Sequence, residues 1–206
     1  MTTLHPTLAL IEQRISANRF DASHTLADAE IARLVQLATR APTAYNLQNW
    51  RFIAVRTPGA KARLRAVAQD QAKVQEAAVC FIVCGVLADP EALAERLQPS
   101  VDAGFMPAAM AQGWLQAAQQ QYASAQAVRD EALRSASFGA MTLMHAAQAL
   151  GLASCAMTGF DAEGVAASFG LASEEVPAML VTVGRAAPGN WPQKPRRPLD
   201  QVLELV

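Results

Sequence analysis

The most constraining feature of the sequence is a long run without charge between Arg134 and Asp161. It contains no Asp, Glu, Lys or Arg and is long enough to span a bilayer. However, the run also contains His145, a glutamine and several hydroxyls, and its pattern changes from helical to strand-like near Gly151. It therefore predicts a fully buried helix, a turn and a buried strand, and not a transmembrane span.

The composition predicts one core-rich domain that covers residues 1–206. Of the 206 residues, 52% are apolar and only 17% are charged. A monomer of this size normally needs more charge to cover its surface, so we expect a large interface between two subunits. The net charge of −1 gives no indication of a nucleic-acid or membrane partner.

The three cysteines, Cys80, Cys84 and Cys155, all lie in apolar runs. They lack the paired spacing of a zinc site or of a disulfide framework. We therefore expect buried thiols in the reducing cytoplasm.

Apolar periodicity predicts the order of the elements along the chain. The expected helices cover residues 6–18, 26–40, 61–68, 130–150 and 161–169, and the expected strands cover residues 50–55, 78–86, 153–157 and 178–183. Thr25 is the expected N-cap of the second helix. The region 89–150 is otherwise helical, and Pro99 is expected to break its first helix.

A polar loop joins the second helix to the first strand. Pro42 prevents the helix from continuing, and Asn46 and Gln48 follow between two aromatic residues. Amide side chains both donate and accept hydrogen bonds, so they suit the edge of a flat heterocycle such as a flavin. The alternative is an ordinary helix-to-strand connection rich in turn-forming residues.

Basic residues occur in two segments at opposite ends of the chain, and the first of these segments is a candidate for binding a phosphate. Arg14 and Ser16 lie where the first helix ends, and an arginine fork with a hydroxyl two residues later can hold a phosphate. The alternative is a solvated helix end. Near the other end, Lys194, Arg196 and Arg197 lie among prolines that would hold them in an extended shape.

Several common catalytic signatures are absent from the sequence. It has no Gly-x-Gly-x-x-Gly fingerprint, no P-loop and no nucleophile elbow. The three histidines have no Glu or Cys at ligand spacing, so we expect no metal site. His145 lies in an apolar helix and is expected to be a satisfied core histidine. If the chain is an enzyme, its chemistry belongs to a bound organic cofactor.

Taken together, these segments resemble the nitroreductase family of FMN-dependent oxidoreductases over nearly the whole chain. Four motifs carry the resemblance, in the family's order and spacing. They are Arg14, Ser16 and Phe20; Pro42, Thr43, Asn46, Gln48 and Trp50; Ala156 to Asp161; and Lys194, Arg196 and Pro198.

The resemblance implies an α+β fold in which helices wrap a small central mixed sheet. It also implies an intertwined homodimer with FMN at the subunit interface. The implied reaction is ping-pong: NAD(P)H reduces the flavin at N5, and a nitroaromatic, quinone or enal then takes the electrons. The acceptor stays open, because it depends on the lid at residues 98–125.

The resemblance also assigns cofactor-binding residues, with no catalytic side chain. Arg14, Ser16, Lys194 and Arg196 would hold the FMN phosphate and ribityl chain. Pro42, Thr43, Ala44, Asn46 and Gln48 would reach the flavin from the other subunit. Gln71 and Lys73 would meet the pyrimidine edge, and the backbone N–H of Thr158 or Gly159 would face N5.

The sequence departs from the family pattern at two positions. Asn18 replaces a basic residue near the flavin N1–C2 carbonyl, which leaves Lys73 as the cation for the reduced flavin. Asn49 replaces a proline and is expected to change loop rigidity alone. Two alternatives remain: a flavin-fragmenting or dehalogenating relative with a dedicated substrate, or a flavin-binding dimer without turnover.

Overall fold

A four-stranded antiparallel sheet lies at the centre of the computed structural model, which describes residues 5–206. Its strands are β1 (Trp50–Val55), β2 (Val79–Val86), β3 (Ala153–Met157) and β4 (Glu175–Gly184), in the order β1-β2-β4-β3. The four strands pair antiparallel throughout, and a parallel bridge joins Ser16 to Ser154 at the β3 edge. The expected mixed character of the sheet is thus limited to this bridge.

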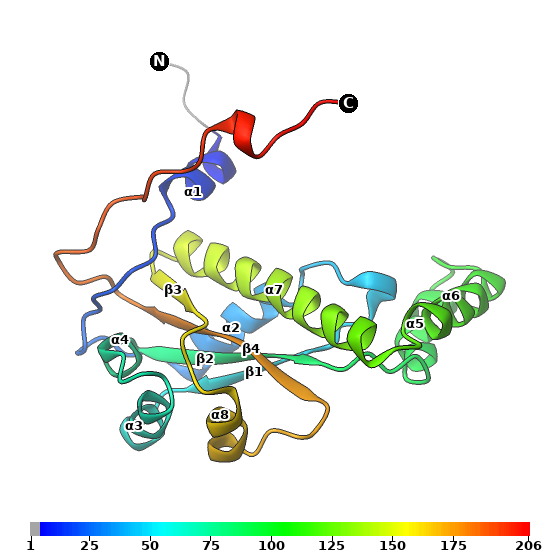
Figure 1. Cartoon of the computed structure of the whole chain (residues 1–206), viewed down its shortest axis with the longest axis horizontal. Coiled ribbons are helices and arrows are strands. Elements are labelled where there is room, and N and C mark those ends of the chain that lie inside the picture. Colours follow the sequence, from blue (N-terminus) through cyan, green and yellow to red (C-terminus); the bar gives the residue numbers. More distant parts are fainter. Residues whose placement is uncertain (1–4) are drawn as a thin grey trace.

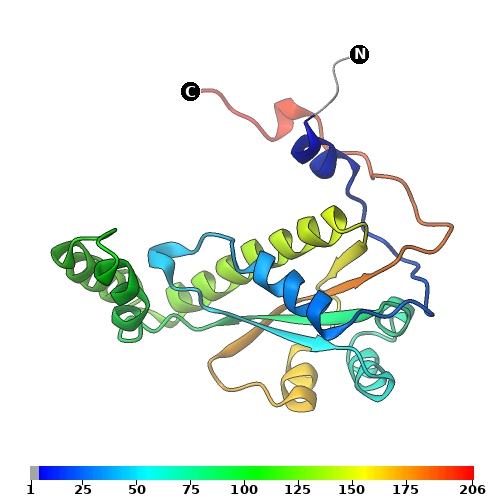
Figure 2. The same cartoon turned by 180° about the vertical axis from the view of Figure 1, so that it is seen from behind.

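Helices cover both faces of the sheet (Figures 1 and 2). On one face, α2 (Asp28–Ala38) and α7 (Ala125–Ala149) enclose the core with Phe81 and Val83 of β2. On the other face, α3 (Pro58–Ala66), α4 (Ala72–Glu76) and α8 (Ala162–Phe169) enclose it with Ile82. Because successive residues of β2 point to opposite faces and both faces are covered, this strand is apolar without alternation.

The long helix α7 forms much of the centre of the molecule. Its small residues are buried against the sheet, as the charge-free run predicts. It starts earlier than expected, because Ser124 caps its N-terminus by accepting a hydrogen bond from the N–H of Ala127 at 3.2 Å. No helix in residues 5–206 combines the length and apolar character needed to cross a membrane.

The end of α1 and the start of α2 also differ from the sequence prediction. The first helix, α1 (Pro6–Gln13), ends before residue 18, because the chain from Arg14 is extended toward its bridge with β3. Thr25 is not the cap of α2. Instead, the N–H of Ala27 donates to the carboxylate of Glu30 at 2.8 Å, which satisfies one of the free donors at this helix end.

The expected break at Pro99 was wrong. Helix α5 (Leu93–Asp102) runs through this proline, because the Pro99 carbonyl still accepts from the N–H of Ala103. Leu97 is buried and anchors the same helix. Together with α6 (Ala108–Gln121), α5 stands at one end of the molecule, away from α1 (Figure 1).

The expected last strand is longer than predicted and contains a proline. Pro177 lies within β4 and faces Cys84 of β2. The preceding residue of β2, Val83, pairs with Met179, so the pairing leaves out Ala178 of β4. A proline cannot donate to the ladder, so a bulge is the usual way for an inner strand to contain one.

Candidate functional site

The two basic segments meet beside the extended chain that follows α1. The amide Nε2 of Gln193 donates to the backbone oxygen of Arg14 at 2.9 Å. Its Oε1 accepts from Arg196 at 2.8 Å, and Arg196 also donates to the Lys194 carbonyl at 2.8 Å. Figure 1 shows the C-terminal tail beside this part of the chain. The structure therefore joins the backbone at Arg14 to the tail that carries Lys194 and Arg196, through a residue 179 positions later in the sequence.

These three cations have no acidic partner in residues 5–206, whereas other arginines, such as Arg51 and Arg65, form ion pairs. Ser16 lies two residues after Arg14 in the sequence, where its bridge to β3 holds the chain. Two joined segments that carry cations and a hydroxyl, with no carboxylate paired to those cations, have the donor chemistry that a phosphate dianion requires.

A second group of predicted residues meets at the other end of the same segment. Lys73 Nζ lies 3.3 Å from Asn18 Oδ1 and 3.4 Å from Cys155 Sγ on β3. Gln71 Nε2 donates to the carbonyls of Gly159 at 2.9 Å and of Ala68 at 3.1 Å. Both hydrogens of this amide are used inside the protein, so its Oε1 would be an acceptor for a ligand.

Thr158 and Gly159 follow β3 directly, beside this group. A side chain at Gly159 would lie 2.9 Å from the Oε1 of Gln69. The Phe160 N–H donates to the Thr158 carbonyl at 3.1 Å, which makes a tight turn here. Because the Gly159 carbonyl accepts from the Gln71 amide, the backbone of this turn lies beside Gln71.

Backbone strain is concentrated in two of the predicted segments. Five described non-glycine residues have positive φ, and they are Tyr45, Asn46, Gln48, Gln69 and Asp70. The adjacent residues Gln69 and Asp70 are held by Arg65, whose Nε lies 2.7 Å from the Asp70 carboxylate. Such conformations cost free energy and are most often kept at functional sites, so both segments are candidates on grounds independent of side-chain type.

The loop that contains Pro42, Thr43, Ala44, Asn46 and Gln48 lies far from the basic cluster in the same chain. The 3-10 turn η1 (Ala44–Asn46) is beside α5 and α6, while α1 and the tail are at the opposite end (Figures 1 and 2). Thr43 Oγ1 accepts from the Gln48 N–H at 3.0 Å and closes the loop. One chain therefore does not bring this loop to the other predicted residues.

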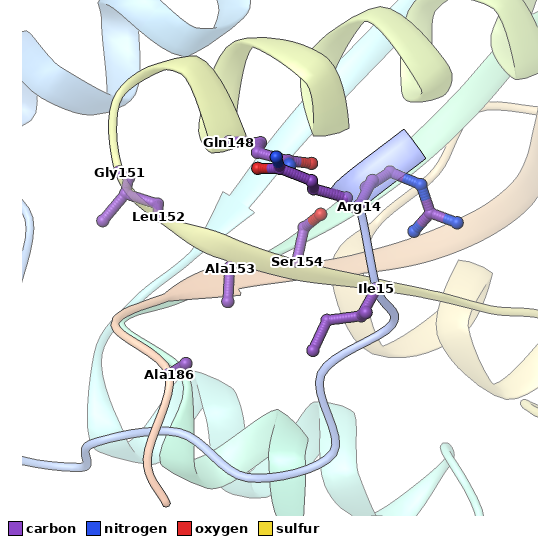
Figure 3. A pocket seen from close by; sticks show the side chains of 9 residues that line it. Arg14, Ile15, Gln148, Gly151, Leu152, Ala153, Ser154 and Ala186 are labelled. Carbon is purple, nitrogen blue, oxygen red and sulfur yellow. The ribbon is translucent and has the colours of Figure 1, made fainter. Parts of the chain in front are cut away.

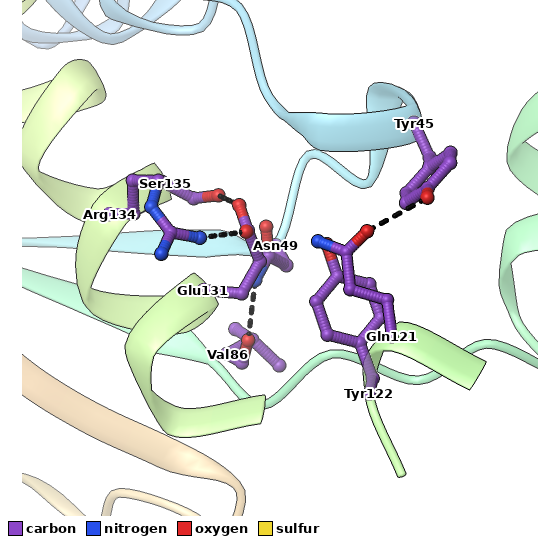
Figure 4. A network of polar contacts seen from close by, with 8 residues as sticks. All are labelled: Tyr45, Asn49, Val86, Gln121, Tyr122, Glu131, Arg134 and Ser135. Carbon is purple, nitrogen blue, oxygen red and sulfur yellow. Dashed lines mark hydrogen bonds and ion pairs between the residues drawn. The ribbon is translucent and has the colours of Figure 1, made fainter. Parts of the chain in front are cut away.

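A polar network that the sequence did not indicate lies behind this loop (Figure 4). Glu131 is 2% exposed, forms an ion pair with Arg134 and accepts from the Ser135 hydroxyl at 3.2 Å. Burial, followed by the charge of Glu131, raises the pKa of Tyr122. The phenol therefore stays protonated and available as a hydrogen-bond donor.

Asn49 and Tyr45 attach the loop to the elements around this network. Asn49 is 1% exposed and donates to the Val86 carbonyl at 2.9 Å, so its role is larger than a change in loop rigidity. The Tyr45 hydroxyl donates to Gln121 Oε1 at 2.9 Å. These contacts fix the loop to β2 and to the end of α6.

A cavity of about 300 Å³ lies beside Arg14, between the end of α7 and the start of β3 (Figure 3). Arg14 and Gln148 line it, whereas Ser16, Lys194 and Arg196 do not. It therefore marks one edge of the candidate site. Nearby, burial and then the charge of Arg14 lower the pKa of His145, whose Nε2 has no partner in residues 5–206. The expectation of a satisfied histidine was thus wrong.

The three cysteines are free and buried, as expected. Burial raises the pKa of Cys84 to about 12, which keeps this thiol protonated. Within residues 5–206, no three His, Cys, Asp or Glu side chains gather in the way a metal site requires.

Sequence reasoning missed Asn190 and Gln193, which join the tail to the segment after α1. Asn190 Oδ1 accepts from the N–H groups of Asn18 at 2.7 Å and Arg19 at 3.0 Å. Its Nδ2 donates to the carbonyls of Arg19 and Ala187, both at 2.9 Å. The only available signal was an amide on each side of Trp191 in a tail otherwise rich in prolines.

Comparison with known proteins finds a family model and individual relatives that match most of this chain. Residues 11–185 match the model of the nitroreductase family. A Bacillus subtilis protein provisionally named NAD(P)H nitroreductase YodC is 34% identical over 197 residues, covering 95% of this chain and 96% of that protein. A Thermus thermophilus protein named NADH dehydrogenase is 35% identical over 179 residues, covering 84% of this chain and 83% of that protein.

Solved structures are similar over the whole chain. A provisional nitroreductase from Exiguobacterium sibiricum, in complex with FMN, has a TM-score of 0.89 at 25% identity. The match covers 100% of this chain and 99% of that one. A second, ydfN from Bacillus subtilis, has a TM-score of 0.90 at 27% identity over 97% of this chain and 98% of that one.

Proposed function

Because the chain belongs to the nitroreductase family, we propose that it carries electrons from NAD(P)H through bound FMN to a small acceptor such as a nitroaromatic, quinone or enal. Its relatives identify it as an NAD(P)H-dependent oxidoreductase with FMN as the cofactor. The acceptor class and the ping-pong order are our proposal. When bound, FMN supplies the redox centre, which accepts a hydride at N5 and passes it on.

The observation that carries the proposal is the contact of Gln193 with both Arg14 and Arg196. This contact joins the segment of Arg14 and Ser16 to the tail that carries Lys194 and Arg196, and the donor set of the two segments would fit the phosphate of FMN. We assign these four residues to the phosphate and ribityl chain. Charge-assisted hydrogen bonds of this kind are the strong ones in cofactor binding.

The group around Lys73 fits the ring end of the cofactor. Lys73 would donate to the pyrimidine edge beside Asn18, and Gln71 would accept through its Oε1. A cation at this edge would stabilise the negative charge of the reduced flavin. The backbone N–H of Thr158 or Gly159 is our candidate donor to N5, because an amide already fixed in the turn needs no reorganisation.

We propose that Pro42, Thr43, Ala44, Asn46 and Gln48 complete the site of a second copy. Their distance from the basic cluster within one chain supports this (Figure 1). Apolar side chains on α1, α7 and the tail are about half exposed and would be covered in a homodimer; they include Leu8, Ile11, Phe138 and Leu203. We place the protein in the cytoplasm, since its cysteines are free.

The first test of this function is the colour and reduction of the purified protein. We expect a yellow protein with the absorbance of FMN. Under anaerobic conditions, NADH or NADPH should bleach it, and an acceptor should restore the colour. A colourless protein that binds no added FMN would contradict the cofactor assignment. A yellow protein that neither nucleotide bleaches would instead be a flavin-binding dimer without turnover.

The second test is the oligomeric state. Sedimentation of the FMN-loaded protein at micromolar concentration should give a dimer, since subunits of this kind bury more than about 2,000 Å² in total. Phe138→Glu places a charge on the exposed face of α7 and should shift the equilibrium toward monomer. FMN should be lost with it. An FMN-loaded monomer would contradict the shared site.

A further inference from the structure

We propose that Asn190 and Gln193 are positioning residues that assemble the phosphate site by holding the tail against the segment after α1. This inference rests on the proposed function, because it concerns the binding of the FMN phosphate. Neither residue is proposed to contact the cofactor. Each acts by fixing groups that do.

Asn190 joins two segments that are far apart in sequence. Its side-chain amide makes four hydrogen bonds, two accepted from the N–H groups of Asn18 and Arg19 and two donated to the carbonyls of Arg19 and Ala187. All of its distances lie between 2.7 and 3.0 Å. Both ends of the amide are therefore used, which fixes its orientation and the spacing of the two segments.

The surrounding backbone bonds continue the same junction. The N–H of Ala187 donates to the Arg19 carbonyl at 3.1 Å, and that of Asp21 donates to the Arg185 carbonyl at 2.9 Å. Gly189 has a φ of +88°, in the left-handed region that favours glycine. The chain thus turns at residue 189 and places Asn190 against the segment 18–19, with the basic tail following directly.

Gln193 lies three residues later and contacts the side chain of Arg196 directly. Its amide spans from the backbone oxygen of Arg14 to the guanidinium of Arg196. Arg196 is exposed, so without this contact its long side chain would have many orientations to lose when a phosphate binds. Asn190 sets the course of the tail, and Gln193 orients the arginine on it.

The experiment compares FMN with riboflavin, which lacks the phosphate. Flavin-free protein is titrated with each by fluorescence quenching, for the wild type, Asn190→Ala and Gln193→Ala. We expect the preference for FMN over riboflavin to fall by about tenfold in each variant, on the scale of a lost charge-assisted contact. Riboflavin affinity should change less than about threefold, whereas general destabilisation would lower both affinities alike.

The matched control is Gln201→Ala. Gln201 is an exposed tail residue whose side-chain Oε1 accepts from Arg197 at 3.3 Å, while its backbone carbonyl accepts from the same arginine at 3.0 Å. Its loss should leave the preference for FMN unchanged. A double variant gives a second check: in an Arg196→Ala background, Gln193→Ala should reduce the preference much less than it does alone, because it acts through Arg196.

The outcomes separate this inference from the proposed function. If the wild type prefers FMN and both variants keep that preference, the positioning roles are wrong and the phosphate site stands. The same holds if the effects of Gln193→Ala and Arg196→Ala are additive. If the wild type shows no preference for FMN, the phosphate site and this inference both fail. Gln193 is exposed, so its variant keeps the test decisive if Asn190→Ala does not fold.

Discussion

Replacing Arg196 with alanine should weaken FMN binding by about tenfold to a hundredfold, whereas Arg197→Ala should leave it nearly unchanged. The two arginines are adjacent and both exposed. Arg196 turns toward Gln193 and so toward Arg14, while Arg197 turns along the tail to Gln201. A charge-assisted hydrogen bond contributes about 1.5–3 kcal/mol, which gives the expected range.

The measurement is FMN fluorescence quenching on flavin-free protein at several salt concentrations. The net charge falls equally in both variants, so long-range attraction cannot explain a difference between them. Adding salt should weaken FMN binding more in the wild type than in Arg196→Ala, because the variant has one contact fewer to screen. Equal FMN affinities for the two variants would overturn the assignment of Arg196 to the phosphate.

The central part of the fold could be predicted from sequence because its pattern has one physical solution. The charge-free run must be buried, and its small residues allow α7 to lie close against β2. Local details were less predictable. Thr25 is a residue type that often caps helices, yet at the start of α2 the Glu30 carboxylate accepts from the N–H of Ala27 instead. Pro99 removes one backbone donor from helix α5. The helix tolerates this loss because the burial of Leu97 keeps it in place.

The candidate site was predictable only where a residue type implies its chemistry. Arginines, a lysine and a serine in two segments indicate a phosphate, and the structure brings those segments together. The roles of Asn190 and Gln193 could not be identified from the sequence. Asparagine and glutamine also occur in ordinary turns, so their residue type does not reveal that they bind distant backbone groups. The positive φ values at Gln69 and Asp70 were equally hidden, since neither residue type requires them.

The close approach of α7 to the sheet leads to the largest expected effect on stability. Gly85 lies in β2, where an added Cβ would be 2.1 Å from the carbonyl oxygen of Ala132 and 2.4 Å from its carbon. These are backbone atoms of a helix that packs along the whole sheet, so they cannot move as a flexible side chain would. Gly85→Ala should therefore lower the free energy of unfolding by about 3 kcal/mol, at the upper end for overpacked cores.

Gly113→Ala is the matched control for this substitution. Gly113 lies inside α6, where an added Cβ meets nothing within 4 Å. Alanine is the better helix former, so this variant should gain about 0.5–1 kcal/mol. Urea titrations of flavin-free protein measure both changes in the free energy of unfolding. All variants are compared at the same protein concentration, because the stability of a dimer rises with protein concentration by mass action. The denaturant slope should stay constant. A Gly85→Ala midpoint equal to that of the wild type would mean that α7 can move away from β2 at little cost, and the tight contact would then not be what holds the long helix on the sheet.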